Sequence, residues 1–502
     1  MLNEFKTYIR RSDMINCVLC GDAPCTQACP NAVDPAGKLR SIWFGNEKGA
    51  AAPFVNAFPC VDCYAPCEGA CIRSGQVPVH KLMSRLHDEV LYGTDPVNIT
   101  DEERLKTDIC GVPLENPYLL SSSVVASTYD MCARAFDAGW AGAAFKTICN
   151  FPIHEASPRY AVIKDTAGTI MGFKNIEQLS DHSVAENMEI FKQLKKNYPT
   201  KFILASIMGQ NEEEWGLLAR MCEENGADAI ELNFSCPNMA EGGLGSDIGQ
   251  IPELVELFTS IAKNSCNIPV LAKLTPNVAS MIPAAAAAKR GGADGIAAIN
   301  TIKSIIGVNP HTYVSAPAVH GMSAVGGYSG NAVKPIALRF LSEIASDPDF
   351  QELHLSGMGG IETWQDALEF ILLGCTSLQV TTAVMQYGYR IIDDLKDGLN
   401  RYLAEKGFAS VKEAVGLAVW NVSASTDVLE RDTVLFPKFD FDKCIGCGRC
   451  AISCSDGGHQ AIRMTKDRKP NLNGSKCVGC HLCLQVCPMN AISSARKRIN
   501  RA

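Results

Sequence analysis

The sequence contains no apolar run long enough to cross a membrane, and its alanine-rich stretch Ile282–Ala288 is stopped by Lys289. It has no secretory signal at its start, because Met1–Lys6 lacks an apolar core. It also lacks a basic excess: the net charge is −8, which argues against a general nucleic-acid binder. No strand–GxGxxG–helix unit occurs, so no FAD- or NAD(P)-binding domain is visible. We therefore expect a cytoplasmic protein that binds neither membranes nor nucleic acid.

Cysteine, by contrast, is abundant. The chain has 502 residues and 23 cysteines, of which sixteen lie in two blocks near its ends. Apolar residues make up 47 % and charged residues 20 %, so the chain is globular and long enough for two to four domains. With this many thiols and no export signal, we expect a reducing, anaerobic setting.

The C-terminal block has the C-x₂-C-x₂-C-x₃-C spacing twice, and this spacing binds 4Fe–4S clusters. The fourth cysteine of each run serves the cluster of the other run. One cluster therefore takes Cys444, Cys447, Cys450 and Cys487, and the other takes Cys477, Cys480, Cys483 and Cys454. A structural zinc site is the alternative, but zinc sites rarely place four cysteines this densely, and rarely twice.

The N-terminal block holds eight more thiols, enough for two further four-ligand clusters. They are Cys17, Cys20, Cys25, Cys29, Cys60, Cys63, Cys67 and Cys71. Disulfides are the alternative, and they would require an oxidising compartment. Both blocks together predict four 4Fe–4S clusters.

Between the two blocks, short apolar strands alternate with helical stretches eight times. Such alternation implies right-handed βαβ units and a parallel sheet, and eight units predict a TIM barrel, with a doubly wound sheet as the alternative. The predicted strands are Tyr118–Ser122, Ala143–Thr147, Phe202–Ile207, Ala229–Asn233, Val270–Leu274, Gly295–Asn300, Glu352–Gly357 and Leu378–Thr382. We expect an N-terminal iron–sulfur domain over 1–100, a barrel domain over 101–425, and a ferredoxin-like domain over 426–502.

Seven of the eight strand ends carry polar or glycine residues, and the C-terminal ends of barrel strands carry the chemistry. The ends are Ser121–Ser123, Lys146-Thr147, Asn233–Cys236, Lys273–Thr275, Asn300-Thr301, Gly357–Gly360 and Thr381-Thr382. One such residue alone would be no more than a helix cap. Seven on one rim predict a site.

The last two ends indicate a phosphate site, because Gly357–Gly360 exposes backbone N–H groups and Thr381-Thr382 opens the next helix. Iron–sulfur clusters transfer one electron at a time, whereas organic substrates are reduced by two electrons. A flavin can do both and so can connect the clusters to the substrate. The phosphate is therefore expected to be that of FMN. Lys146 and Lys273 are candidates for flavin contacts, with a rim salt bridge as the alternative for each.

Cys236 lies just beyond the fourth strand and before the glycine-rich stretch Glu241–Asp247, which would let the loop open and close. A thiol, with an ordinary pKa of about 8.5, can donate a proton near neutral pH, which suits a general acid. The alternative is a buried structural cysteine.

The chain from about Asp108 to Pro488, about three quarters of its length, resembles the catalytic subunit of bacterial NAD-dependent dihydropyrimidine dehydrogenase. The matching segments are WAGAAFKTI (Trp140–Ile148), FKNIE (Phe173–Glu177), LASIM (Leu204–Met208), NFSCP (Asn233–Pro237), AKLTPN (Ala272–Asn277), GGADGIAAINT (Gly291–Thr301), GYSGNAVKPIALR (Gly327–Arg339) and GMGGIET (Gly357–Thr363).

The resemblance implies reversible reduction of uracil or thymine at the 5,6 double bond. Cys236 would protonate C5, and hydride would pass between flavin N5 and C6. The implied pyrimidine-binding residues are Asn175, Glu177, Asn233, Asn300 and Thr301. The implied FMN-binding residues, with their neighbours on the rim, are Ser122, Lys146, Thr147, Lys273, Gly359, Gly360, Thr381 and Thr382.

Two features depart from the family pattern. The N-terminal block resembles the two-cluster module of the FAD- and NAD(P)H-binding partner subunit, yet here it precedes the barrel directly. That resemblance assigns Cys17, Cys20, Cys25 and Cys71 to one cluster and Cys29, Cys60, Cys63 and Cys67 to the other, with Cys60 in place of a family glutamine that aligns near Met83. Asn238 follows Cys236-Pro237 as it does in many dihydroorotate dehydrogenases.

Without a nucleotide-binding domain, the chain needs an electron donor, either a separate FAD- and NAD(P)H-binding flavoprotein subunit or a free ferredoxin. We expect an oligomer. Two rival functions remain: a dihydroorotate dehydrogenase-type oxidation, which should require an added cationic group in the pocket, and an electron-transfer subunit whose barrel is only a scaffold.

Overall fold

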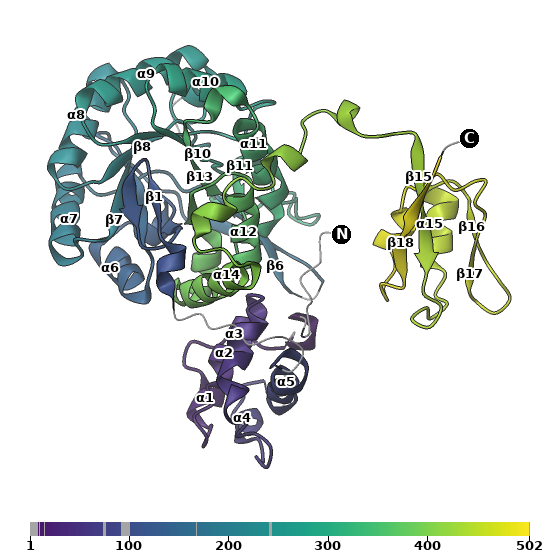
Figure 1. Ribbon diagram of the computed structural model, residues 1–502. Coiled ribbons are helices and arrows are strands. Elements are labelled where there is room, and N and C mark those ends of the chain that lie inside the picture. Colours follow the sequence, from purple (N-terminus) through teal and green to yellow (C-terminus); the bar gives the residue numbers. More distant parts are fainter. Residues whose placement is uncertain are drawn as a thin grey trace. The chain divides into compact units, whose positions relative to one another are not determined.

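The computed structural model describes residues 9, 11–14, 16–73, 77–91, 101–166, 168–239 and 243–500, with side chains to residue 495. Met1–Lys6, and Glu241 and Gly242 of the glycine-rich stretch, lie outside the described residues. The chain divides into two compact units, Met1–Val422 and Ser423–Ala502 (Figure 1). The division into three domains stays a prediction.

The first unit is built on a closed barrel of eight parallel strands, which confirms the predicted TIM barrel. The strands neighbour one another in the order β10-β13-β14-β3-β4-β7-β8-β9. Their bounds are β3 Tyr118–Leu120, β4 Gly142–Ile148, β7 Phe202–Ile207, β8 Ala229–Asn233, β9 Val270–Lys273, β10 Gly295–Ala298, β13 His354–Met358 and β14 Ser377–Val380. Each strand lies within two residues of its predicted start, and β14 ends earlier than predicted because Thr382 begins a helix.

Helices surround the barrel because each apolar strand must be covered on its outer face. The outer helices are α6 Tyr129–Ala138, α7 Val184–Asn197, α8 Glu212–Glu224, α9 Pro252–Ser265, α10 Ile282–Arg290, α11 Lys334–Ala345, α12 Trp364–Leu372, α13 Thr382–Tyr387 and α14 Ile392–Lys406. Local signals fix several starts: Ser183 and Glu186 form a capping box at α7, and Thr363 and Asp366 form another at α12. Among the described residues, no helix is long and apolar enough to cross a membrane.

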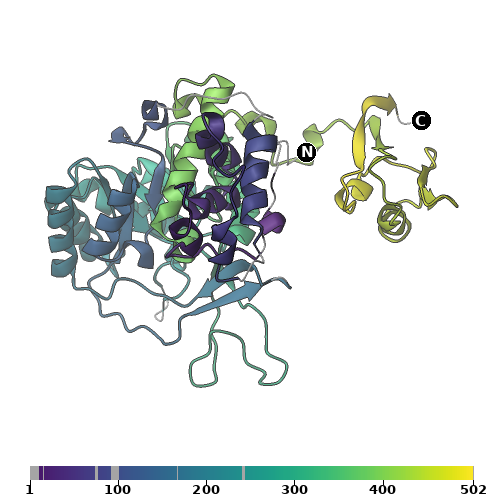
Figure 2. The same cartoon turned by 90° about the horizontal axis from the view of Figure 1, so that it is seen from below.

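The barrel is closed at one end and extended at the other. A hairpin of β1 (Thr107–Ile109) and β2 (Val112–Leu114) precedes the first barrel strand and packs its apolar side chains against β3, β7 and β9. A four-stranded antiparallel sheet, in the order β11-β12-β6-β5, is inserted after β4 and β10. Its strands are β5 Tyr160–Lys164, β6 Ile170–Asn175, β11 Ile302–Ser304 and β12 Gly326–Ser329. Figure 2 shows these strands and the loop between β11 and β12 projecting from the barrel.

This inserted sheet was not foreseen, and it supplies residues to the mouth of the barrel. Lys174 of β6 is fully buried and donates to the carbonyls of Ala316 and Ala324 at 3.0 and 2.6 Å. One ammonium therefore ties the long β11–β12 loop to the sheet. Its neighbour Asn175 ends β6 and turns toward the barrel mouth.

A small helical module precedes the barrel within the same unit. It contains α1 Pro24–Gln27, α2 Pro35–Trp43, α3 Glu47–Ala51, α4 Pro66–Gly69 and α5 Val79–Arg85. Its own apolar cluster includes Phe54, Cys60, Cys67, Leu82 and Met83. With so small a core, the module gains stability from the barrel and from whatever its thiols bind.

The second unit is a compact arrangement of two short helices and two antiparallel strand pairs. Its elements are β15 Thr433–Phe439, α15 Arg449–Gly457, β16 Ile462–Met464, β17 Pro470–Leu472, α16 Leu482–Gln485 and β18 Ile492–Asn500. The first strand, β15, pairs antiparallel with the last, β18, and closes the unit. The buried core holds Cys454 and Cys483 between the two helices and β16.

Candidate active site and iron–sulfur sites

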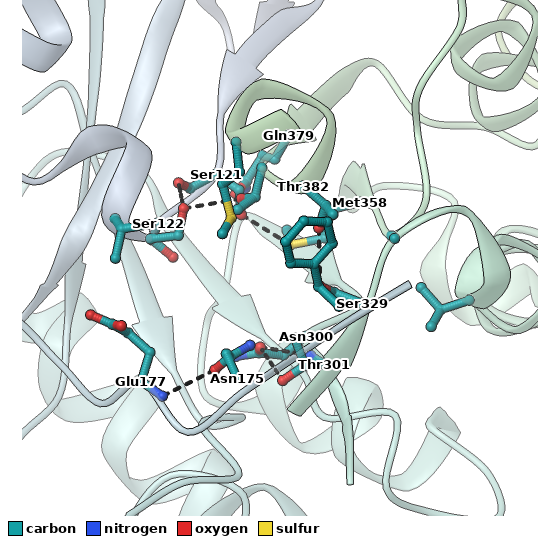
Figure 3. A pocket seen from close by; sticks show the side chains of 18 of the residues that line it. Ser121, Ser122, Asn175, Glu177, Asn300, Thr301, Ser329, Met358, Gln379 and Thr382 are labelled. Carbon is teal, nitrogen blue, oxygen red and sulfur yellow. Dashed lines mark hydrogen bonds between the residues drawn. The ribbon is translucent and has the colours of Figure 1, made fainter. Parts of the chain in front are cut away.

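A single large cavity opens at the C-terminal ends of the barrel strands, under the inserted sheet. It holds about 1310 Å³ of empty space. This space includes open solvent at the mouth of the cavity. In Figure 3, Asn175 and Glu177 lie near Asn300 and Thr301, while Ser121, Ser122, Gln379 and Thr382 lie across the cavity.

Cys236 and all the residues predicted to bind the pyrimidine or FMN line this one cavity. They are Ser122, Lys146, Thr147, Asn175, Glu177, Asn233, Cys236, Lys273, Asn300, Thr301, Gly359, Gly360, Thr381 and Thr382. The structure thus brings together residues from seven strand ends and from the inserted sheet. Their individual roles stay predictions.

A buried charged network forms the floor of the cavity. Lys273 Nζ lies 3.1 Å from Glu231 Oε1 and 2.7 Å from Ser122 Oγ, and Ser122 also donates to Glu231. Gln379 donates to the other oxygen of Glu231 at 2.9 Å, which leaves Gln379 Oε1 buried without a hydrogen-bond partner. Glu231 is fully buried. Sequence reasoning missed it, although a carboxylate inside the apolar strand Ala229–Asn233 was a usable signal.

A chain of amide and hydroxyl groups runs along one wall. Asn233 Nδ2 donates to Thr147 Oγ1 at 2.9 Å, and Asn233 Oδ1 accepts from Ser235 Oγ at 2.8 Å. Asn300 Nδ2 donates to the same Ser235 hydroxyl at 2.9 Å, and Asn300 Oδ1 accepts from the Thr301 N–H at 2.7 Å. These bonds fix the orientation of both amides, which can then read donors and acceptors on a planar ligand.

Asn238, on the loop after Cys236, joins this wall to the inserted sheet. Its Nδ2 donates to Asn175 Oδ1 at 3.0 Å and to the Glu177 carbonyl at 2.8 Å. Its Oδ1 is buried and has no hydrogen-bond partner. A buried acceptor left unpaired is costly, and a ligand N–H would satisfy it. Asn238 therefore joins the candidate substrate-binding residues, and its place directly after Cys236-Pro237 was the signal.

Cys236 is 7 % exposed and lines the cavity. Burial raises the pKa of its thiol to about 11; the Asn238 N–H and the charges of Lys273 and Lys146 oppose this shift, and Glu155 adds to it. The group is therefore a protonated thiol at neutral pH. That state suits proton donation and does not suit nucleophilic attack, which needs the thiolate.

Lys146 takes part in a second charged cluster at the edge of the cavity. Its Nζ lies 2.9 Å from Glu177 Oε1, and Glu177 Oε2 accepts from the Tyr160 hydroxyl at 2.5 Å and pairs with Arg159 at 3.3 Å. Glu155 stands 3.8 Å from the same ammonium, and burial raises the pKa of its carboxyl. Both predicted lysines therefore have carboxylate partners, as the rim salt-bridge alternative proposed, and both still line the cavity.

The glycines after β13 form a cradle, and their positions leave no room for a side chain. Gly359 and Gly360 have φ of +117° and +85°. A Cβ on Gly360 would stand 2.8 Å from the Lys334 Cβ and 3.0 Å from the Gly330 carbonyl. Beside them, the Thr382 hydroxyl donates to Ser329 at 3.0 Å. This cradle and the unpaired Gln379 oxygen fit a flavin mononucleotide, whose phosphate the glycines would hold.

Two cavities in the second unit are each lined by four cysteines. Cys444, Cys447, Cys450 and Cys487 line one of about 370 Å³, and Cys454, Cys477, Cys480 and Cys483 line one of about 340 Å³. These are the two ligand sets that the crossed spacing predicts. Every one of the chain's 23 cysteines is free of disulfides.

The N-terminal thiols form two sets as well. Cys17, Cys20, Cys25 and Cys71 line a cavity of about 760 Å³. Burial raises the pKa of Cys60, and the nearby Cys63 and Cys29 add to the shift. Burial also raises the pKa of Cys67, with further contributions from the charge of Glu68 and from Cys29 and Cys63, so these thiols are neighbours. No three His, Cys, Asp or Glu side chains in the described ranges converge as a single-ion site. Thiols spread around a cavity fit a cluster of several irons.

The barrel and its site define a flavin-dependent oxidoreductase coupled to iron–sulfur clusters. The dihydroorotate dehydrogenase family model matches residues 104–403, and the 4Fe-4S dicluster domain matches residues 438–494. The chain belongs to the dihydroorotate dehydrogenase family, whose cofactor is FMN, and carries a 4Fe–4S ferredoxin domain.

Several named relatives share most of this chain. It is 52 % identical over 390 residues to the NAD-dependent dihydropyrimidine dehydrogenase subunit PreA of Escherichia coli K12, covering 77 % of this chain and 94 % of that protein. It is 35 % identical over 342 residues to the chloroplastic dihydropyrimidine dehydrogenase (NADP(+)) of Arabidopsis thaliana, covering 66 % and 80 %. It is 38 % identical over 316 residues to the dihydroorotate dehydrogenase B catalytic subunit of Pyrococcus abyssi, covering 63 % and 99 %.

Proposed function

We propose that the chain is the pyrimidine-transforming subunit of a dihydropyrimidine dehydrogenase, which interconverts uracil or thymine with the 5,6-dihydropyrimidine. One observation carries the proposal: the protonated thiol of Cys236 shares a cavity with the oriented amides of Asn175, Asn233 and Asn300. A pyrimidine ring presents alternating N–H and C=O groups. Amides that both donate and accept are the side chains that match such an edge.

The protein's own groups have separable tasks in this reaction. Asn233, Asn300 and Thr301 bind one amide edge, and Asn175 with the unpaired Asn238 oxygen binds the other. Cys236 would deliver its proton to C5 of the bound ring. FMN, when bound, exchanges the hydride at C6. In the reverse direction the thiolate of Cys236 receives the proton.

Lys273 and the floor network hold the flavin side of the cavity. Lys273 is 2 % exposed, and Glu231 and Ser122 hold its ammonium in place, so it would lie at a fixed position beside the cofactor. Lys146 and Glu177 close the edge of the site and limit the entry of water. Gly359, Gly360, Thr381 and Thr382 seat the phosphate.

The charges in the cavity favour a neutral substrate over a carboxylate. Among the described residues that line it, the lysines and arginines are Lys146 and Lys273, and both pair with a glutamate. A dihydroorotate carboxylate would need a cation free to receive it, since burying an unpaired charge is costly. Oxidation of dihydroorotate is the second candidate function, because some relatives are named as dihydroorotate dehydrogenases.

Electrons are proposed to come from a separate FAD- and NAD(P)H-binding flavoprotein subunit or a ferredoxin, within an oligomeric enzyme. The Escherichia coli relative is itself named as a subunit. Free thiols throughout suit the reducing cytoplasm in which we propose the enzyme works.

An anaerobic titration of the purified, FMN-loaded chain tests the proposal. Dihydrothymine should bleach the flavin absorbance, and thymine should perturb its spectrum by stacking on it. Dihydroorotate at the same concentration should leave the flavin oxidised. Bleaching by dihydroorotate alone would support the second candidate, and no response to any of the three would mean that the barrel is a scaffold.

A further inference from the structure

The N-terminal module is fastened to the barrel by buried polar contacts. Arg40 Nε lies 2.7 Å from Asp394 of α14, whose side chain is 2 % exposed, and Ser41 donates to the other oxygen of Asp394 at 2.5 Å. Trp364 of α12 donates its indole N–H to the Gly45 carbonyl at 2.9 Å. The Arg40–Asp394 pair favours one orientation of the module on the barrel. Any other orientation would leave the buried Asp394 carboxylate without its charge partner, which is costly.

One barrel side chain completes the wall of the cavity of Cys17, Cys20, Cys25 and Cys71. Arg390, in the 3-10 turn Tyr389–Ile391, lines that cavity and donates to the carbonyls of Leu19 and Cys20 at 2.7 and 3.3 Å. Its Nε donates to the Tyr387 carbonyl at 3.1 Å. The guanidinium thus joins the thiol-bearing loop to the end of α13.

The same helix α13 forms part of the flavin cavity. Its residues Thr382, Ala383, Met385 and Gln386 line that cavity, and Tyr387 ends the helix. Six residues at about 1.5 Å rise span only about 9 Å. The Tyr387 ring packs edge-on against Phe44 at 5.2 Å and lies 6.3 Å from Trp43, both of the module. Helix α13 therefore lines the flavin cavity, and Arg390, three residues beyond its end, lines the four-thiol cavity.

We propose that the cluster held by Cys17, Cys20, Cys25 and Cys71 exchanges electrons directly with FMN across α13, with Arg390 as the positioning residue. Electrons then reach the flavin by a route that does not pass through the C-terminal ferredoxin domain, and we call this route the electron port. This port rests on the FMN site of the proposed function. The other N-terminal thiol set reaches the surface, where Val61 and Tyr64 are 68 % and 84 % exposed. A reduced flavoprotein or ferredoxin can deliver electrons there.

The electron count balances over two transfers. The donor gives up two electrons one at a time, each cluster is reduced and reoxidised in turn, and FMN gains two electrons and one proton from solvent. The positive charge of Arg390 stabilises the reduced cluster, which carries one more negative charge than the oxidised cluster.

The first test measures the cluster potential rather than turnover. In the full-length, reconstituted protein, Arg390→Ala should keep its iron content while one cluster signal in an EPR redox titration moves to lower potential. A tenfold change in the one-electron equilibrium, ~59 mV, is the expected scale. Arg390→Lys should restore part of the shift. Arg339→Ala, which removes an arginine paired with Glu343 on α11, is the matched control and should change nothing. Unchanged potentials in Arg390→Ala would remove Arg390 from the proposal.

The second test measures how close the flavin lies to the cluster of Cys17, Cys20, Cys25 and Cys71. A Cys447→Ser, Cys480→Ser variant lacks both C-terminal clusters while the barrel keeps its flavin. The flavin radical, trapped during stepwise photochemical reduction of this variant, should relax faster in samples in which the cluster of Cys17, Cys20, Cys25 and Cys71 is also reduced. Adding Cys20→Ser and Cys25→Ser should abolish that enhancement. Equal relaxation with and without the N-terminal cluster would overturn the port, whereas failure of the dihydrothymine titration would overturn only the proposed function.

Discussion

Replacing Cys236 with alanine should separate the proton transfer from all other functions of the cavity. The side chain is 7 % exposed and loses only its sulfur, so the cost in folding stability is about 1 kcal/mol, small for a barrel of this size. FMN and clusters should remain bound. Turnover of the pyrimidine should fall by about 10²–10⁴-fold, the contribution of a positioned general acid.

The pH dependence gives an independent check of the same residue. With a thiol pKa of about 11, proton donation should be constant from neutral pH upward and fall as the pH approaches 11. Dihydropyrimidine oxidation needs the thiolate, so its rate should rise with pH over the same range. Cys236→Ser should remain nearly inactive at every pH, because a serine hydroxyl is a far weaker acid.

Single-turnover bleaching of the flavin by dihydrothymine in stopped flow is the assay. Cys149→Ala is the matched control: its thiol is 5 % exposed, its pKa is also raised to about 11 by burial, and it bonds to the Phe151 carbonyl away from the cavity lining. The control should react at the parent rate. Near-normal rates in Cys236→Ala, or a loss of equal size in Cys149→Ala, would refute the assignment of the acid.

Three further predictions follow from other parts of the chain. Four clusters imply about sixteen irons per chain, and Cys60→Ser should lower that number if Cys60 is a ligand; an unchanged iron count would point to a residue near Met83 instead. The isolated chain should not oxidise NADH or NADPH but should accept electrons from artificial one-electron donors, and brisk NADH-driven thymine reduction by a reductase-free preparation would contradict this. Glu231→Gln leaves Lys273 buried without its charge partner and should cost about 3–5 kcal/mol in denaturant unfolding. The surface control Glu343→Gln should cost less than about 1 kcal/mol, and comparable losses in the two variants would argue against the floor network.

The barrel could be predicted from the sequence because its signals are local. The strands Phe202–Ile207 and Ala229–Asn233 coincide with β7 and β8, since short apolar runs between capped helices leave little choice. The site residues at the barrel rim could be predicted from the positions of the strand ends alone. The inserted sheet that carries Asn175 could not be predicted in this way, because β6 pairs with β12, about 150 residues away in the chain. The same holds for Arg390, whose bonds to Leu19 and Cys20 join parts of the chain some 370 residues apart.

The pairing of β15 with β18 has an evolutionary consequence. Thr433 lies opposite Asn500 and Val434 opposite Ile499, so the chain enters and leaves the second unit at one edge. A segment whose two ends adjoin can be added to a host, or removed from it, without rethreading either core. Gene fusion could therefore place such a two-cluster cassette behind barrels of different specificity.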